Sequence, residues 1–179
     1  TTLFVKDNVY KELFEVTKIM NYNSDESKEM IDSIAKRLNI DTLFEKHPYD
    51  LSGGEQQKLA FAKILLMQPK IILLDEPTKG IDAYSKRIIG EVLQQLKKEG
   101  MTIVMVTHDI EFAAEYADRC GMFFDGNLVS VEPTVNFFSN NNYYTTAASR
   151  ISKPFYKNTI TCNMLVRLCK ENGEKRHES

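Results

Sequence analysis

The sequence predicts an α/β fold with a parallel sheet, and three stretches carry this prediction. Residues 71–74 form an apolar run that is too short for a helix and is apolar at successive positions, which is typical of a strand buried on both faces. Residues 101–106 form a similar run. Between them, residues 84–99 have the apolar spacing of a helix, and such a helix can connect two parallel strands.

A further helix is predicted to begin at Ser52 and to end before Pro69. Ser52 is followed three residues later by Glu55, which is the pattern of a capping box. Gly53 and Gly54 leave the first-turn amides uncovered, and the helix dipole adds positive potential at this end. The start of this helix is therefore a candidate site for a phosphate group.

Two carboxylates directly follow the first predicted strand. Asp75 and Glu76 stand at its carboxyl end, where ligand sites of parallel sheets lie. Asp75 can hold Mg²⁺ through its water shell, and Glu76 can polarise an attacking water. The structural alternative is that the acidic pair holds a loop by accepting amide hydrogen bonds. His108 follows the second strand in the corresponding place, although a single histidine is more often structural.

In this order, the motifs resemble those of the ATP-binding-cassette (ABC) ATPases. Residues 52–56, Ser-Gly-Gly-Glu-Gln, resemble the signature motif, and residues 71–76 resemble the Walker B strand with its catalytic glutamate. Residues 78–82 resemble the D-loop, and residues 107–109 resemble the switch-histidine loop. The resemblance implies an α/β, RecA-like P-loop NTPase fold with a helical subdomain, and ATP and Mg²⁺ as cofactors.

The resemblance also implies a role for each matching residue. In the family, two cassettes close head to tail, and each nucleotide lies between one phosphate loop and the other cassette's signature motif. Glu76 and His108 would be catalytic, with His108 bonded to the γ-phosphate, and Asp75 would hold the metal. The residues implied in ATP binding are Ser52, Gly53, Gly54, Glu55 and Asp82, the last lying across the dimer seam.

Composition restricts the classes of partner. The 179 residues are 42% hydrophobic and 27% charged, as in a globular protein large enough for one ordinary domain core. The net charge of −2 gives no electrostatic case for nucleic acid. No apolar run reaches the length of a membrane span. The family resemblance then implies a peripheral place on the cytoplasmic face of the membrane, through integral membrane transporter subunits and a second ATPase cassette.

The three cysteines are odd in number and lack Cys-x-x-Cys spacing, which favours a reduced, cytosolic setting with Cys120 as a small core residue. A phosphate loop, Gly-x-x-x-x-Gly-Lys-Ser/Thr, is absent from the sequence; the nearest approach, at Gly121 and Gly126, lacks the lysine. We therefore expect the C-terminal part of a nucleotide-binding domain that alone neither binds ATP tightly nor hydrolyses it.

The chain is expected to divide into four parts: a helical subdomain part (1–50), the signature helix and RecA-like core (51–132), a C-terminal extension (133–170) and a disordered tail (171–179). Helices are predicted within residues 1–20 and after a cap at Ser24 or Asp25. Residues 121–131 are predicted to form a hairpin that turns at residues 125–127.

The end of the chain resembles, more narrowly, the second cassette of the duplicated ATPase of energy-coupling-factor (ECF) transporters, an importer class for vitamins or metal ions. The similar residues are 118–120, 123–126, 137–140 and 143–150, together with the D-loop. The aromatic residues here could instead form a flap on the domain's own sheet. Two other functions stay open: a cassette ATPase outside transport, and a non-enzymatic interaction module. The transported substrate is not readable, because other subunits select it.

Overall fold

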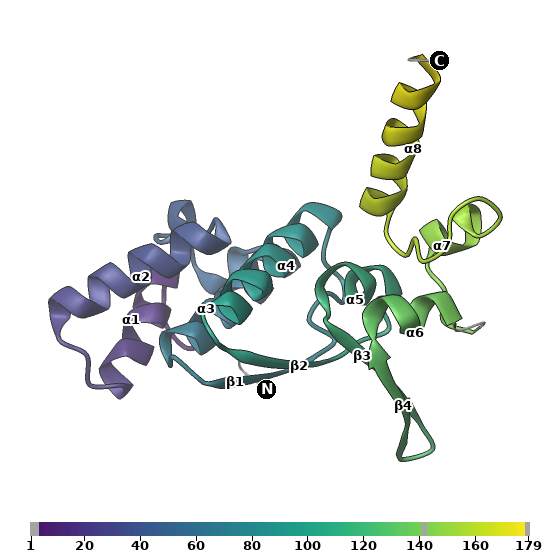
Figure 1. The fold of residues 1–179 in the computed structure, drawn as a ribbon. Coiled ribbons are helices and arrows are strands. Elements are labelled where there is room, and N and C mark those ends of the chain that lie inside the picture. The colour runs from purple at the N-terminus through teal and green to yellow at the C-terminus, as the bar shows by residue number, and fades with distance from the viewer. Residues whose placement is uncertain (1–3, 141–142, 178–179) are drawn as a thin grey trace. The chain divides into compact units, whose positions relative to one another are not determined.

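The computed structural model describes residues 4–140 and 143–177, which fall into two compact units (Figure 1). The first unit is Thr1–Val106 and the second is Thr107–Ser179. The candidate helix start and the acidic pair belong to the first unit, whereas His108 belongs to the second.

The first unit contains a bundle of helices and a two-stranded parallel sheet. Its elements are α1 (Val9–Ile19), α2 (Ser24–Leu38), two 3-10 turns (Asp41–Leu43 and Pro48–Asp50), α3 (Gly53–Leu66), β1 (Ile71–Asp75), α4 (Ala83–Lys98) and β2 (Thr102–Val106). Helices α1, α2 and α3 pack against one another, and α4 contacts α2, α3 and β2 (Figure 1). The predicted helices and strands of this region are therefore confirmed in type and order.

One helix boundary differs from its prediction. The cap of α2 is Asn23 and not Ser24 or Asp25, because Asn23 has extended backbone and its side chain accepts a hydrogen bond from the amide of Glu26. The carboxylate of Glu26 accepts the amide of Asn23 in return, which completes a capping box. The reciprocal hydrogen bonds of Asn23 and Glu26 therefore determine where α2 begins.

The sheet is parallel, as predicted, but only one of its faces is buried. Strands β1 and β2 pair in register from Ile71 opposite Thr102 to Asp75 opposite Val106. On the face that the helices cover, Ile72 is 3% exposed. On the other face Leu73 is 75% exposed, so the prediction of a strand buried on both sides is wrong for the described residues of this unit. The sequence of β1 is apolar on both faces, but α4 packs on only one face of the sheet.

The second unit contains a β-hairpin and helices of 6 to 16 residues. Its elements are α5 (Ile110–Tyr116), β3 (Arg119–Phe124), β4 (Asn127–Pro133), α6 (Thr134–Asn140), α7 (Ala147–Ser152) and α8 (Cys162–His177). The predicted hairpin is confirmed, with β3 and β4 antiparallel. Its turn residues Asp125 and Gly126 both have positive φ, 46° and 75°, which is the backbone of a type I′ turn.

Aromatic residues of α6 form the core of the second unit. Phe137 and Phe138 are buried in a cluster with Ala114 and Ile160, and α6 contacts both strands of the hairpin. For these two residues, the structure agrees with a flap that covers the domain's own sheet. Tyr143, in contrast, is 91% exposed.

A disordered tail was predicted from residue 171, and the described residues 171–177 have helical backbone. Helix α8 continues through His177, and residues 178–179 lie outside the described residues. Its surface carries an ion pair one turn apart, with Arg167 Nε 2.9 Å from Glu171 Oε1. The side-chain amide of Asn172 donates to the hydroxyl of Tyr156 at 2.7 Å. Glu171 and Asn172, at the start of the predicted tail, therefore each have a side-chain partner.

Candidate functional site

The start of α3 has the geometry that the capping box predicted. Ser52 is the N-cap, with φ −61° and ψ 159°, and its Oγ accepts the amide of Glu55 at 3.3 Å. Oε2 of Glu55 accepts the amide of Ser52 at 2.8 Å. This hydrogen bond, together with the Ser52 hydroxyl, lowers the pKa of the Glu55 carboxyl. Ser52 and Gly53 are exposed, so this helix end faces solvent.

The two glycines of α3 have different surroundings. A Cβ atom at Gly53 would meet no other atom within 4 Å. At Gly54, a Cβ atom would lie 3.2 Å from Oγ of Ser85 and 3.5 Å from Oδ2 of Asp82. Gly54 therefore permits the close approach of α3 to the start of α4, while Gly53 leaves an open backbone surface. The first-turn amides of an α-helix have no carbonyl partner within the helix, so they can donate to an anion.

Asp82 has a local structural role in addition to its predicted role across a dimer seam. It is the N-cap of α4, and its Oδ1 accepts the amide of Ser85 at 2.9 Å. This hydrogen bond from the backbone lowers the pKa of the Asp82 carboxyl. The D-loop carboxylate thus lies beside the glycine-led start of α3 within one chain. Its contact with another cassette stays a prediction.

The acidic pair stands at the carboxyl end of β1. Asp75 is the last residue of the strand and is exposed. Glu76 follows with a φ of 47°, and its amide donates to the carbonyl of Val106 at 2.9 Å, which extends the parallel ladder by one bond. A residue other than glycine with positive φ is uncommon, and such backbone strain clusters at functional sites. The predicted catalytic glutamate is one of six residues other than glycine that have positive φ among the described residues.

Gln57 is a residue of this region that the sequence analysis did not single out. Its side-chain amide donates to the carbonyl of Pro77 at 2.8 Å, so α3 is bonded to the loop that follows Glu76. The same loop ends at Asp82, which contacts Gly54. Gln57 lies four residues after Gly53 and therefore on the same side of the helix. This spacing was the signal that could have identified Gln57 as a residue of the site.

His108 lies in the second unit, two residues after Val106, which is the register partner of Asp75. It is exposed, and its carbonyl accepts the amide of Ile110 at 3.0 Å. Asp109 caps α5 by accepting a hydrogen bond from the amide of Phe112 at 3.1 Å. The placement of His108 against the acidic pair stays a prediction from the sequence.

The carboxylates of this region suit a metal ion that binds together with phosphate, and not a site in which protein side chains supply every ligand. Among the described residues, no three His, Cys, Asp or Glu side chains are grouped as a metal ion would require. A single exposed carboxylate such as Asp75 fits Mg²⁺, which keeps several waters and binds one or two carboxylates plus phosphate oxygens. His47 is exposed, and its Nδ1 accepts a hydrogen bond from the amide of Tyr49 at 3.3 Å. Across residues 4–140 and 143–177, no helix has the length and apolar content that a membrane crossing requires.

Comparison with known proteins relates these residues to one family. Residues 2–79 match the family described as ABC transporter. A Bacillus cereus protein named as an ABC transporter ATP-binding protein is 42% identical over 166 residues, which cover 93% of this chain and 30% of that protein. The glutamate transport ATP-binding protein GluA of Corynebacterium efficiens is 40% identical over 138 residues, which cover 77% of this chain and 56% of that protein. The chain thus spans about a third to a half of these relatives.

Solved structures of similar fold are ATP-binding cassettes. CbiO1 from Clostridium perfringens, described as part of the ABC transporter complex CbiONQ, has a TM-score of 0.71 and 29% identity, covering 83% of this chain and 57% of that one. A dimeric cassette in a post-hydrolysis state with ADP and phosphate has a TM-score of 0.65 and 28% identity, covering 74% of this chain and 59% of that one. The fold is therefore that of part of an ABC ATPase cassette, of the RecA-like P-loop class.

Proposed function

We propose that this chain is the C-terminal part of the ATPase of an ABC transporter, the family that residues 2–79 match. The observation that carries the proposal is the contact between two motifs of the first unit. The capped, glycine-led start of α3 is open to solvent at Gly53 and is tied at Gly54 and Gln57 to the loop that follows Glu76. A helix start open to an anion is thereby linked to the loop that follows a glutamate with positive φ.

The start of α3 would bind the γ-phosphate of an ATP held by another cassette. Ser52 offers a hydroxyl, and Gly53 and Gly54 offer first-turn amides at the positive end of the helix dipole. This set donates to phosphate oxygens but contains no lysine, so the rest of the triphosphate requires a phosphate loop from elsewhere. Glu55 would keep the cap in place, because its carboxylate accepts the Ser52 amide.

The acidic pair would serve a second nucleotide, at the site that a phosphate loop of its own cassette completes. Glu76 would accept a proton from the attacking water. Its backbone conformation sets the direction in which its side chain leaves the main chain. His108 would donate a hydrogen bond to the γ-phosphate. Asp75 would hold Mg²⁺ through water, and the bound ion would neutralise charge on the phosphate oxygens. Asp82, beside Gly54, would couple this site to the other one.

The partners would be a second ATPase cassette and integral membrane transporter subunits, which would place the chain at the cytoplasmic face of the membrane. Relatives named for glutamate transport, and the likeness to CbiO1, support an importer. The narrower proposal is the second cassette of an ECF-type ATPase for a vitamin or metal ion. The length of the Bacillus cereus relative is compatible with it, because the match includes 93% of this chain and only 30% of that protein, which leaves room for another cassette. The 179 residues alone are proposed to be inactive.

The test begins with the coding sequence upstream of Thr1. The proposal predicts an in-frame Gly-x-x-x-x-Gly-Lys-Ser/Thr, and MgATP-dependent association of the protein that contains it. Ser52→Ala should weaken that association, while Asn23→Ala, which removes the N-cap of α2, serves as the matched control. The absence of nucleotide-dependent association, or hydrolysis by the 179 residues alone, would contradict the proposal.

A further inference from the structure

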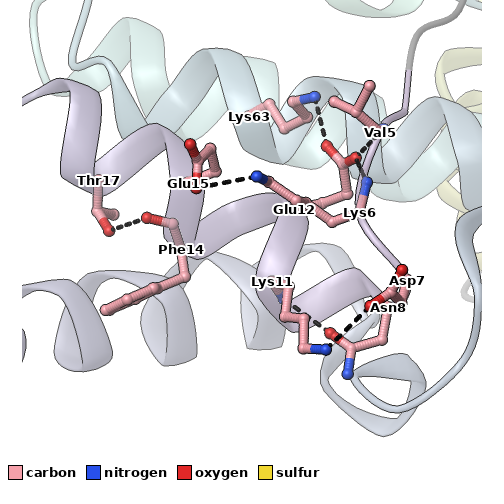
Figure 2. A network of polar contacts seen from close by, with 10 residues as sticks. All are labelled: Val5, Lys6, Asp7, Asn8, Lys11, Glu12, Phe14, Glu15, Thr17 and Lys63. Atoms are coloured by element: carbon pink, nitrogen blue, oxygen red, sulfur yellow. Dashed lines mark hydrogen bonds and ion pairs between the residues drawn. The ribbon is translucent and has the colours of Figure 1, made fainter.

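The first unit contains a buried carboxylate that the proposed mechanism does not use. Glu12, in the first turn of α1, is 1% exposed. A buried charge is costly unless it is paired and hydrogen-bonded, and Glu12 has three donors around it (Figure 2). Its Oε2 accepts a hydrogen bond from Nζ of Lys63 at 2.7 Å. Its Oε1 accepts the amide of Lys6 at 2.6 Å and also the amide of Val5.

These donors come from two different parts of the unit. Lys63 belongs to α3, the helix whose start is the candidate phosphate site. The two amides belong to residues 4–6, which precede α1 and which we call the strap. Burial alone would raise the pKa of Glu12, but the bonds from Lys63, Lys6 and Val5 outweigh burial, so its pKa is lowered. Glu12 is thus held as an anion between the strap and α3.

The strap has a second tie, close to the start of α3. The hydroxyl of Tyr49 donates to the carbonyl of Phe4 at 3.2 Å, and the two rings meet edge to face with centroids 6.1 Å apart. Tyr49 precedes the N-cap Ser52 by three residues. Phe4 is 2% exposed, and its ring also lies 5.6 Å from Nζ of Lys63. One short strap therefore contacts α3 at Lys63 and the segment that leads into its start.

We infer that Glu12 is a positioning residue, which fixes the start of α3 through Lys63 and through the strap that Tyr49 also holds. Ser52 and Lys63 are eleven residues apart, which is about 16 Å along a helix, so Glu12 would not touch a phosphate bound at Ser52. It acts because α3 is a continuous helix. Lys63 holds this helix to Glu12, and Tyr49 holds the segment before its N-cap to the strap. This inference rests on the proposed function only in giving the start of α3 a phosphate to bind.

The test measures hydrogen exchange of the 179-residue chain without nucleotide. Glu12→Ala should speed exchange about tenfold in the strap and α1, because bonds to a charged group are lost, and also in residues 49–59, which include the start of α3. Val92→Ala, in α4, is the control for general destabilisation and should speed all protected amides alike. Glu12→Gln should give the Glu12→Ala pattern at smaller amplitude and serves if Glu12→Ala fails to fold.

Substitutions of Lys63 separate the two ties. Lys63→Arg keeps the charge and should exchange as the unsubstituted chain does. The double substitution Glu12→Lys with Lys63→Glu restores the charge attraction between α1 and α3 but removes the carboxylate that accepts the strap amides. Hydrogen exchange of the strap amides should therefore stay as fast as in Glu12→Ala. Faster exchange confined to the strap and α1, or a uniform increase as in Val92→Ala, would overturn the inference.

A second readout links the tie to nucleotide. In the protein expressed with its upstream coding sequence, Glu12→Gln should raise the ATP concentration for half-maximal association several-fold and change the maximal rate of hydrolysis less. If the unsubstituted protein shows no ATP-dependent association, the proposed function fails, while the exchange result still decides the role of Glu12. An effect of Glu12→Gln on the maximal rate alone would contradict the positioning role.

Discussion

Replacing Glu76 by glycine, and separately by alanine, tests whether the backbone conformation at this position is strained. Both variants remove the carboxylate, so their difference isolates the backbone. A residue other than glycine costs about 1–2 kcal/mol in the left-handed region, and φ at Glu76 is 47°. Glycine costs about 0.5–1 kcal/mol more than alanine in ordering the unfolded chain. The difference predicts that Glu76→Gly is more stable than Glu76→Ala by about 0.5–1 kcal/mol.

Glu91 provides the matched control, since it is exposed in the interior of α4. There, glycine should be less stable than alanine by about 1 kcal/mol, so the sign of the effect reverses. The assay is urea unfolding followed by circular dichroism, together with exchange of α4 amides, which reports on the first unit. At position 76, exchange should be about 2- to 5-fold slower in the glycine variant than in the alanine variant. If Glu76→Gly unfolds at lower urea than Glu76→Ala, the strain argument is refuted.

Three further outcomes are expected. Gly54→Ala should lower the free energy of unfolding by about 1 kcal/mol in a urea titration, because its Cβ would lie 3.2 Å from the first turn of α4, whereas Gly53→Ala should not lower it. The stability that Glu12 adds over Glu12→Gln should be complete above pH 4.5 and lost as pH falls through its lowered folded pKa, so unfolding titrations of both chains should converge in acid and not at pH 7. Cys120, whose pKa burial raises, should react more slowly with iodoacetamide at pH 8 than the exposed Cys162, as mass spectrometry can measure; equal rates would contradict its burial.

Local signals explain what the sequence predicted well. The capping pair of Ser52 and Glu55 determines where α3 begins, because the two side chains and amides involved are three residues apart. Asp125 and Gly126 similarly determine the hairpin turn, since both must adopt positive φ. Neither prediction depends on contacts with distant parts of the chain.

Features that depend on distant contacts were not predictable in the same way. The apolar run of β1 did not reveal that one face would be exposed at Leu73, because burial depends on which elements cover the sheet. Glu12 is a charged residue within a predicted amphipathic helix, yet it is buried and paired with Lys63. Its position, three residues after Val9 and four before Val16, lies on the apolar stripe of α1, and that spacing was the available signal.

The motifs select single residues as candidates, whose roles stay predictions, but they do not predict the backbone conformation at those residues. The sequence identified Glu76 as the catalytic candidate and gave no sign of its positive φ. That conformation arises where the strand ladder to Val106 ends and the loop to Pro77 begins, which only the paired strands define. The bond from Gln57 to Pro77 was missed for the same reason.

The most direct test of the account is the rate of ATP hydrolysis by the protein expressed with its upstream coding sequence, with and without Glu76→Gln. The account predicts that Glu76→Gln keeps MgATP-dependent association and lowers the maximal rate about 100-fold or more, because a positioned general base contributes about 10²- to 10⁴-fold. Hydrolysis by Glu76→Gln at a rate close to that of the unsubstituted protein would contradict it.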